Sequence, residues 1–209
     1  GFDVISFLAA KYYDLENTAE TKEEKYKYKT LLDMIIPVAK TYPSEAGNIS
    51  VSNGIQVLGG YGFCSDFILQ QYYRDIRISS IYEGTTGIQS QDLLGRKITM
   101  ENGKGLELLS SEIIKSISHA NKNDDLKIYA GMLSEKIDLT QKVLKKLMPL
   151  ALKGDYERFL ADASVFMEFF SLIIISWSWL DIGITAKNQL EKNNFDHKLL
   201  KGKLEAMKY

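Results

Sequence analysis

Two glycine-containing turns hold the residues that are best suited to chemistry. One lies at residues 59–62, with the sequence GGYG, and the other at residues 83–85, with the sequence EGT. The second turn places the carboxylate of Glu83 just before a predicted helix, for which Thr85 or Thr86 supplies the capping hydroxyl. A carboxylate on such a turn has little side-chain freedom, and it can act as a base once it is shielded from water. From the spacing alone, a solvated turn residue or a partner of the helix dipole is the simpler interpretation of Glu83.

Other residue types that often carry chemistry are sparse. The glycines of the first turn could let the backbone approach a ligand closely, or they could simply end a helix. The single cysteine, Cys64, has no evident histidine partner, and we expect a buried or inert thiol. The two histidines, His119 and His197, lack the spacing of a metal site, so the sequence predicts no bound metal.

The composition excludes several classes of protein. Of the 209 residues, 45% are hydrophobic and 25% are charged, as in a soluble globular protein. The formal net charge of -1 provides no basic field for nucleic acid or anionic lipid. A single cysteine fits a reducing compartment and no signal peptide opens the chain, so we expect a cytoplasmic protein. The apolar residues 165–186 contain too short an uncharged run for a membrane-spanning helix, which favours a buried core helix and no transmembrane segment.

Hydrophobic residues recur at spacings of three and four, which predicts an all-α chain. The first helix is expected at residues 2–16. A capping box at Thr21 and Glu24 then begins a helix that ends near Gly59, with Pro37 and Pro43 expected to kink or restart it. The remaining predicted helices lie at 67–75 with Asp66 as the cap, from the second turn to about 98, and at about 104–120, 124–152, 156–192 and 196 to the end.

The segment at residues 76–82 is predicted to be an extended connection into the turn at Glu83. The overall expectation is a partial four-helix bundle at residues 1–100, followed by a helical extension at residues 101–209.

Two longer motifs contain the two turns. The first is QVLGGYGF at residues 56–63, and the second is RDIRI at residues 74–78 followed by IYEGTTGIQ at residues 81–89. In this order and at this separation, they resemble the C-terminal helical domain of the flavin-dependent acyl-CoA dehydrogenases. The run DLLGRK at residues 92–97 and the helices after it are similar to the branch with an extra C-terminal helical domain, which includes methylmercaptopropionyl-CoA dehydrogenase.

The resemblance implies a role for each residue of the two motifs. Glu83 would be the base that takes the α-proton of an acyl-CoA thioester, while the flavin accepts the β-hydride. Tyr82 and Gly84 would lie beside the substrate, where the missing side chain of Gly84 leaves room for the thioester. Eight positions would contact FAD: Gln56, Val57, Leu58, Gly59 and Gly60 toward the flavin of the neighbouring subunit, and Thr85, Thr86 and Gly87 beside the adenosine diphosphate part. Gly87 stands where many relatives carry a longer side chain.

The family is normally much longer than this chain, with an N-terminal helical domain, a β-domain and an Arg-containing flavin motif upstream. The resemblance therefore implies a C-terminal part of an FAD-dependent acyl-CoA dehydrogenase that would be inactive alone. The complete protein would be a homodimer that passes electrons to electron-transferring flavoprotein. Two alternatives stay open: a non-catalytic helical module for dimerisation or partner binding, and a DNA-associated relative, against which the net charge counts.

Overall fold

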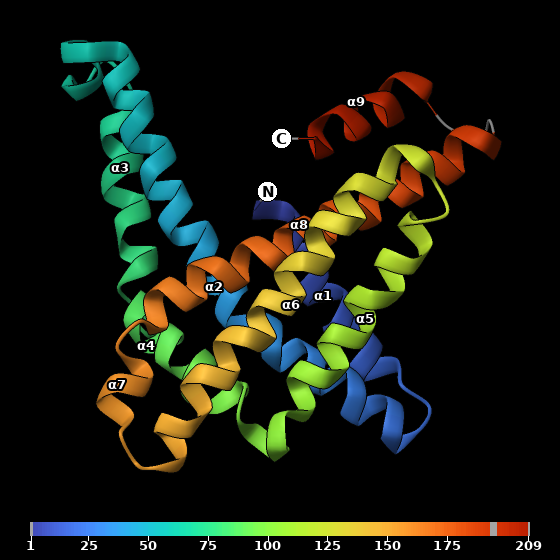
Figure 1. The fold of residues 1–209 in the computed structure, drawn as a ribbon. Coiled ribbons are helices and arrows are strands. Elements are labelled where there is room, and N and C mark those ends of the chain that lie inside the picture. The colour runs from blue at the N-terminus through green and yellow to red at the C-terminus, as the bar shows by residue number, and fades with distance from the viewer. Residues whose placement is uncertain (1, 193–195, 209) are drawn as a thin grey trace.

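The computed structural model of the protein describes residues 2–192 and 196–208. Within these ranges every regular element is a helix, as the sequence predicts (Figure 1). In chain order the elements are α1 (Phe2–Thr18), α2 (Lys22–Leu58), η1 (Gly59–Phe63), α3 (Leu69–Arg77), η2 (Ile78–Ser80), α4 (Thr86–Gln91), η3 (Asp92–Lys97), η4 (Met100–Gly103), α5 (Lys104–Ala120), α6 (Asp124–Leu152), α7 (Tyr156–Leu160), α8 (Ala163–Lys192) and α9 (His197–Met207).

The long helix α2 begins and ends where the sequence predicts. The Thr21 hydroxyl accepts a hydrogen bond from the Glu24 amide at 3.1 Å, and the Glu24 carboxylate accepts one from the Thr21 amide at 3.3 Å. At the other end the helix stops before Gly59, whose φ is +58°. The predicted restart at Pro37 or Pro43 is wrong, because α2 continues through both. Buried side chains on both sides of Pro37 hold the helix in place and offset the hydrogen bonds that the prolines remove.

One hydrophobic core joins helices from both halves of the chain. Ile5 of α1, Leu31 of α2, Leu109 of α5 and Ile174 of α8 are all buried in it. The predicted division at residue 100 therefore stays a proposal, because the helices on its two sides share this core.

The helix α8 runs through the middle of the molecule (Figure 1). By length and composition it could cross a membrane, but 56% of its most apolar window is buried inside the protein. Its residue Trp177 is buried and donates a hydrogen bond from Nε1 to Ser116 Oγ at 2.8 Å. These contacts fit the predicted core helix.

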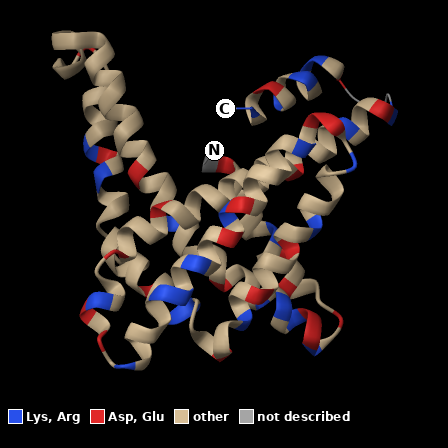
Figure 2. Ribbon diagram, in the orientation of Figure 1, with Lys and Arg blue, Asp and Glu red and all other residues tan. Residues whose placement is uncertain are grey.

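The second half of α2, together with η1 and α3, projects from the body as a helical hairpin, which we call the arm (Figure 1). The two helices pack closely because Gly47 and Gly54 of α2 face Ile76 and Leu69 of α3. A Cβ atom at Gly54 would lie only 3.1 Å from a Leu69 methyl group. Asp66 is the only charged residue between positions 46 and 73, so the outer arm is almost free of charge (Figure 2).

The prediction of an extended connection at residues 76–82 is wrong. Helix α3 begins at Leu69 without a side-chain cap, two residues later than expected, and it continues to Arg77. A 3-10 turn then follows, in which the amides of Ile81 and Tyr82 donate to the Ile78 carbonyl at 2.9 and 3.1 Å. The isoleucines of this segment resemble a strand pattern, but the packing of α3 against α2 overrides that preference.

The predicted single helix at residues 156–192 is also wrong. It is divided into α7 and α8, and the carbonyl of Asp162 starts the second helix by accepting a hydrogen bond from the Phe166 amide at 2.9 Å. The break lets Phe159 of α7 reach the core. Leu160 packs against Gly95 of η3, where a Cβ atom built on the glycine would lie 3.2 Å from a Leu160 methyl group. Burial of Phe159 and the packing of the half-buried Leu160 explain why the chain turns here.

Candidate active site

The turn before α4 has an unusual backbone. Glu83 has φ +53° and Gly84 has φ +90°, so two successive residues lie at positive φ. Only glycine takes such angles without steric cost. A non-glycine residue in this region is uncommon and often marks a functional site. The positive φ of Glu83 therefore points to a functional site without reference to any sequence motif.

Side chains from two helices hold this turn. The Gln89 side chain of α4 donates from Nε2 to the Glu83 carbonyl at 3.1 Å, and Lys40 Nζ of α2 donates to the Gly84 carbonyl. The next residue, Thr85, has extended backbone angles and caps α4 by accepting a hydrogen bond from the Ile88 amide at 3.3 Å. This cap confirms the predicted helix start at Thr85.

Two further contacts tie the same segment to α2. Thr86 donates its hydroxyl hydrogen bond to the Glu45 carboxylate, and Ser44 Oγ donates to the Ser79 carbonyl at 3.2 Å. After α4 the chain widens into the π-type helix η3, which buries Leu93. It ends at Lys97 with Ile98 as its C-cap, close to the predicted helix end at about 98. The turn is thus fixed between α2 and the start of α4.

The site is open on the side of the carboxylate. Glu83, Tyr82 and Ile81 are all exposed. A base for a weakly acidic C–H bond needs shielding from water, and the described residues leave this surface uncovered. The geometry presents one carboxylate on a rigid turn, with space around it for a ligand.

The structure separates the two groups of predicted site residues. Tyr82, Glu83, Gly84, Thr85, Thr86 and Gly87 share the turn and the first residues of α4. Gln56 to Gly60 lie at the tip of the arm, far from that turn in the same chain (Figure 1). The tip is exposed, with Val57 85% accessible, and nothing lies within 4 Å of a Cβ built at Gly59 or Gly60.

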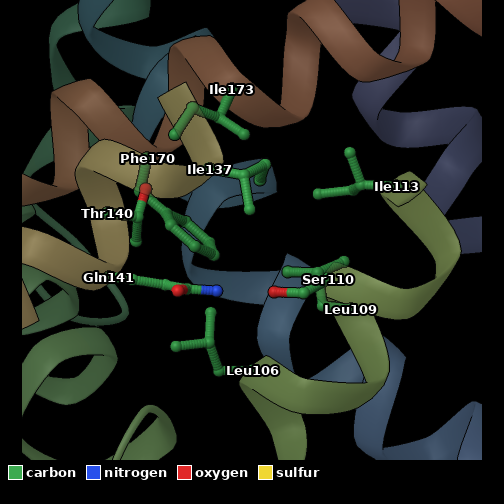
Figure 3. Close-up of a pocket in the computed structure, with 9 residues that line it drawn as sticks. All are labelled: Leu106, Leu109, Ser110, Ile113, Ile137, Thr140, Gln141, Phe170 and Ile173. Atoms are coloured by element: carbon green, nitrogen blue, oxygen red, sulfur yellow. The ribbon is translucent and has the colours of Figure 1, made fainter. Parts of the chain in front are cut away.

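Two hollows between the described helices are lined by other residues. A cavity between α5, α6 and α8 is lined by side chains such as Leu109, Ile137 and Phe170, and its volume of about 10 Å³ admits one water molecule at most (Figure 3). A larger apolar groove of about 470 Å³ lies between α6, α8 and α9, where Trp179 and Met132 line it. Among the described residues there is no cluster of side chains that could hold a metal ion.

Family models match both halves of the chain. Residues 8–98 match the model described as "Acyl-CoA dehydrogenase, C-terminal domain", and residues 109–209 match "Acetyl-CoA dehydrogenase C-terminal like". The chain belongs to the acyl-CoA dehydrogenase family. The two matches meet close to the predicted boundary between an acyl-CoA dehydrogenase bundle and its extension.

Individual members of the acyl-CoA dehydrogenase family support this assignment. A butyryl-CoA dehydrogenase of Syntrophomonas wolfei is 29% identical over 95% of this chain and 33% of its own length. A 3-methylmercaptopropionyl-CoA dehydrogenase of Ruegeria pomeroyi is 39% identical over 40% of this chain and 14% of its own. The chain thus spans about a third or less of the length of these curated relatives.

A solved acyl-CoA dehydrogenase has the same fold. The crystal structure of Caenorhabditis elegans ACDH-11 in complex with C11-CoA superposes with a TM-score of 0.72 and 23% identity, over 87% of this chain and 30% of that one. The predicted all-α fold, and the family to which the motifs pointed, are therefore confirmed.

Sequence reasoning missed the residues that hold the turn. Lys40 and Glu45 lie 44 and 41 positions before their partners, Gly84 and Thr86, and no local pattern announces either contact. Gln89 belongs to the recognised motif, but its bond to the Glu83 carbonyl becomes visible only in the folded chain.

Proposed function

We propose that this chain is the C-terminal part of an FAD-dependent acyl-CoA dehydrogenase in which Glu83 is the base. The observation that carries the proposal is the carboxylate of Glu83 on a backbone-strained turn directly before α4, in a chain of this family. Strain of this kind persists where the surrounding structure holds it, and it is typical of functional sites.

In this proposal Glu83 takes the proton from the carbon next to the thioester carbonyl. The exposed ring of Tyr82 borders the substrate in this proposal, and Gly84 lies beside the thioester. The acyl-CoA class of substrate is supported by the names of the relatives and by the C11-CoA complex of ACDH-11. The acyl chain and the rest of the protein would shield Glu83 from water, as a base for a weakly acidic C–H bond requires.

The residues proposed to hold FAD fit such a group. Gln56, Val57, Leu58, Gly59 and Gly60 form an open, nearly uncharged surface at the tip of the arm, where glycine allows a ligand to approach the backbone. Thr85, Thr86 and Gly87 offer hydroxyls and amides at the start of α4. When bound, FAD would supply the acceptor for the hydride from the β-carbon.

The distance between the two groups of residues supports a homodimer. Lys40, which contacts the turn at Gly84, and Gln56 lie 16 positions apart on α2, or about 24 Å at 1.5 Å per residue. One chain therefore cannot bring both groups to a single small site, whereas the arm of a second copy could complete it. Electron-transferring flavoprotein is the proposed electron acceptor of the complete enzyme.

Turnover by the complete, flavin-loaded protein tests the proposal. A panel of saturated acyl-CoA thioesters is mixed with the enzyme and an electron acceptor, and the enoyl-CoA product is identified by mass spectrometry. We expect a product two hydrogens lighter than the substrate. A flavin-loaded protein that oxidises none of the thioesters would instead favour the non-catalytic helical module, and salt-sensitive binding to DNA would favour the DNA-associated relative.

A further inference from the structure

One face of α2 lies along the segment that carries the proposed base. Lys40 and Ser44 are four positions apart and therefore share a side of the helix, and Glu45 directly follows Ser44. Ser44 bonds the Ser79 carbonyl, Lys40 bonds the Gly84 carbonyl, and Glu45 accepts from Thr86. The three contacts span the whole connection between η2 and α4, so α2 acts as a support for the turn.

The two carbonyls of the positive-φ pair have one side-chain donor each. Gln89 donates to the carbonyl of Glu83, and Lys40 donates to the carbonyl of Gly84. The Gln89 amide also fills the space where a side chain at Gly84 would lie, because a Cβ there would be 2.9 Å from Gln89 Nε2. The missing side chain of Gly84 and the bond from Gln89 are therefore parts of one arrangement.

The direction of the Glu83 carboxylate depends on this backbone. In the described part of the chain, no residue donates a hydrogen bond to the Glu83 side chain, which extends from the turn into open space. The side-chain torsions of Glu83 can rotate, but φ and ψ of this residue set the Cα–Cβ vector from which the side chain starts. Groups that fix these angles therefore fix the point from which the carboxylate reaches a substrate.

We propose that Lys40 and Gln89 are positioning residues for Glu83, holding the Glu83–Gly84 backbone in its positive-φ conformation. The inference rests on the proposed function of Glu83 as the base. Neither side chain needs to touch the substrate. Both act through the two carbonyl groups, and misplacing a reacting group by about 1 Å can cost on the order of a hundredfold in rate.

The test compares variants of the complete, flavin-loaded protein. Lys40→Met and Gln89→Leu remove the donors while keeping similar side-chain length, and Lys40→Arg keeps a donor. Lys29→Met and Gln91→Leu are matched controls, because both residues are exposed on the same helices. Anaerobic mixing with increasing acyl-CoA gives the limiting rate of flavin reduction and the substrate Kd separately.

We expect Lys40→Met and Gln89→Leu to lower the limiting rate by about tenfold to a hundredfold, with the substrate Kd and the flavin content almost unchanged. Lys40→Arg should recover most of the rate, and the controls should match the wild type. Equal losses of rate and affinity, unchanged rates in both variants, or an Arg variant as slow as the Met variant would overturn the proposal.

Amide hydrogen exchange provides a readout that does not depend on catalysis. Exchange in the peptide covering residues 81–89 should accelerate in Lys40→Met and Gln89→Leu but not in the controls. A Glu83→Gln variant is measured in parallel. If that variant reduces its flavin normally, the proposed function fails, whereas the exchange result still shows whether Lys40 and Gln89 fix the turn. Unchanged exchange with an inactive Glu83→Gln would overturn the positioning role alone.

Discussion

Glu83 is one of three non-glycine residues at positive φ in the described chain, together with Glu101 and Asn102. The other two lie in the connection between α4–η3 and α5, where the Glu101 carboxylate accepts a hydrogen bond from the Tyr26 hydroxyl. Left-handed backbone at a non-glycine residue costs roughly 1–2 kcal/mol. At Glu83 the residue in this strained conformation also carries an exposed carboxylate. Strained backbone of this kind is typical of functional sites.

A substitution at Gly84 tests the backbone of the turn. Gly84→Ala introduces a side chain at φ +90° and 2.9 Å from the Gln89 amide, so we expect the free energy of unfolding to fall by about 1–2 kcal/mol. Gly131→Ala is the control, because Gly131 lies inside α6 with nothing within 4 Å. The control should gain roughly 0.5–1 kcal/mol. Denaturant unfolding measures both, and a stabilised Gly84→Ala protein would contradict the described turn.

Asp181 lowers the free energy of unfolding by an amount that depends on pH. Burial raises the pKa of this carboxyl, although Ser116 and nearby cations oppose the shift. Because the folded pKa lies above the unfolded one, the cost is absent below the unfolded pKa and grows as pH rises through the interval between the two. Asp181→Asn should therefore stabilise the protein near neutral pH, and the gain should vanish in acid. Denaturant midpoints at several pH values measure this gain.

Asp125 is the control of opposite sign. The hydrogen bond and charge of Lys187 lower the pKa of this carboxyl. Its stabilising contribution to the free energy of unfolding is therefore present above the unfolded pKa and is lost as pH falls through the folded pKa. Asp125→Asn should not stabilise the protein at neutral pH. If both variants respond to pH in the same direction, the assignment of Asp181 as a partly buried acid with a raised pKa is wrong.

At the scale of elements, the sequence predicts helices best where periodicity and caps agree. Helix α6 has the expected bounds of 124–152, and α2 begins at the capping box of Thr21. The errors occur where contacts distant in sequence decide the local structure. Packing of Ile76 against Gly47 continues α3 beyond its predicted end. Burial of Phe159 and packing of Leu160 against Gly95 break the expected helix at 156–192.

In the candidate site, too, local features could be predicted from the sequence and contacts between distant residues could not. The Glu83 turn and its Thr85 cap are local features, and the sequence shows both. The bond from Lys40 to Gly84 joins two helices, and it could be predicted only by someone who knew which face of α2 meets the turn. The distance between Gln56 and Glu83 within one chain likewise depends on the direction of the arm, which no local pattern determines (Figure 1).

The role of α8 as a core helix is tested by truncating one buried side chain. Phe170 is 2% exposed and stacks on Phe166 with ring centroids 5.9 Å apart, so Phe170→Ala should cost about 3–5 kcal/mol in the free energy of unfolding. Val165→Ala lies on the same helix but at a position that is 65% exposed, and should change stability by less than about 0.5 kcal/mol. Equal effects of the two substitutions would contradict the packing of α8.

At the scale of the whole molecule, the arm separates the two groups of residues that are proposed to form the site. It projects from the body, exposes apolar side chains such as Val57 and Phe63, and is almost uncharged over residues 46–73. Exposed apolar surface of this kind is typical of a contact with another molecule. A second copy of the chain would bury this surface and bring Gln56 to Gly60 toward a neighbouring flavin.

Charged residues at the tip of the arm should therefore disrupt the proposed homodimer. We expect Val57→Asp combined with Phe63→Asp to convert the complete protein from dimer to monomer and to release FAD, because both side chains are more than 80% exposed in the single chain. Light scattering measures the mass and absorbance measures the flavin. Leu152→Asp, at an equally exposed position outside the arm, is the control. A dimer that survives the double substitution, or a wild-type tetramer, would contradict the proposal.

The base is tested most directly by the rate of flavin reduction in a Glu83→Gln variant of the complete enzyme. Glutamine keeps the size of the side chain and removes its basic oxygen, so FAD and acyl-CoA should still bind. Under anaerobic mixing with acyl-CoA, we predict that bleaching of the flavin slows by at least the 10²- to 10⁴-fold range that is typical of general-base catalysis. A variant that reduces its flavin within about threefold of the wild-type rate, well short of that range, would show that Glu83 is not the base.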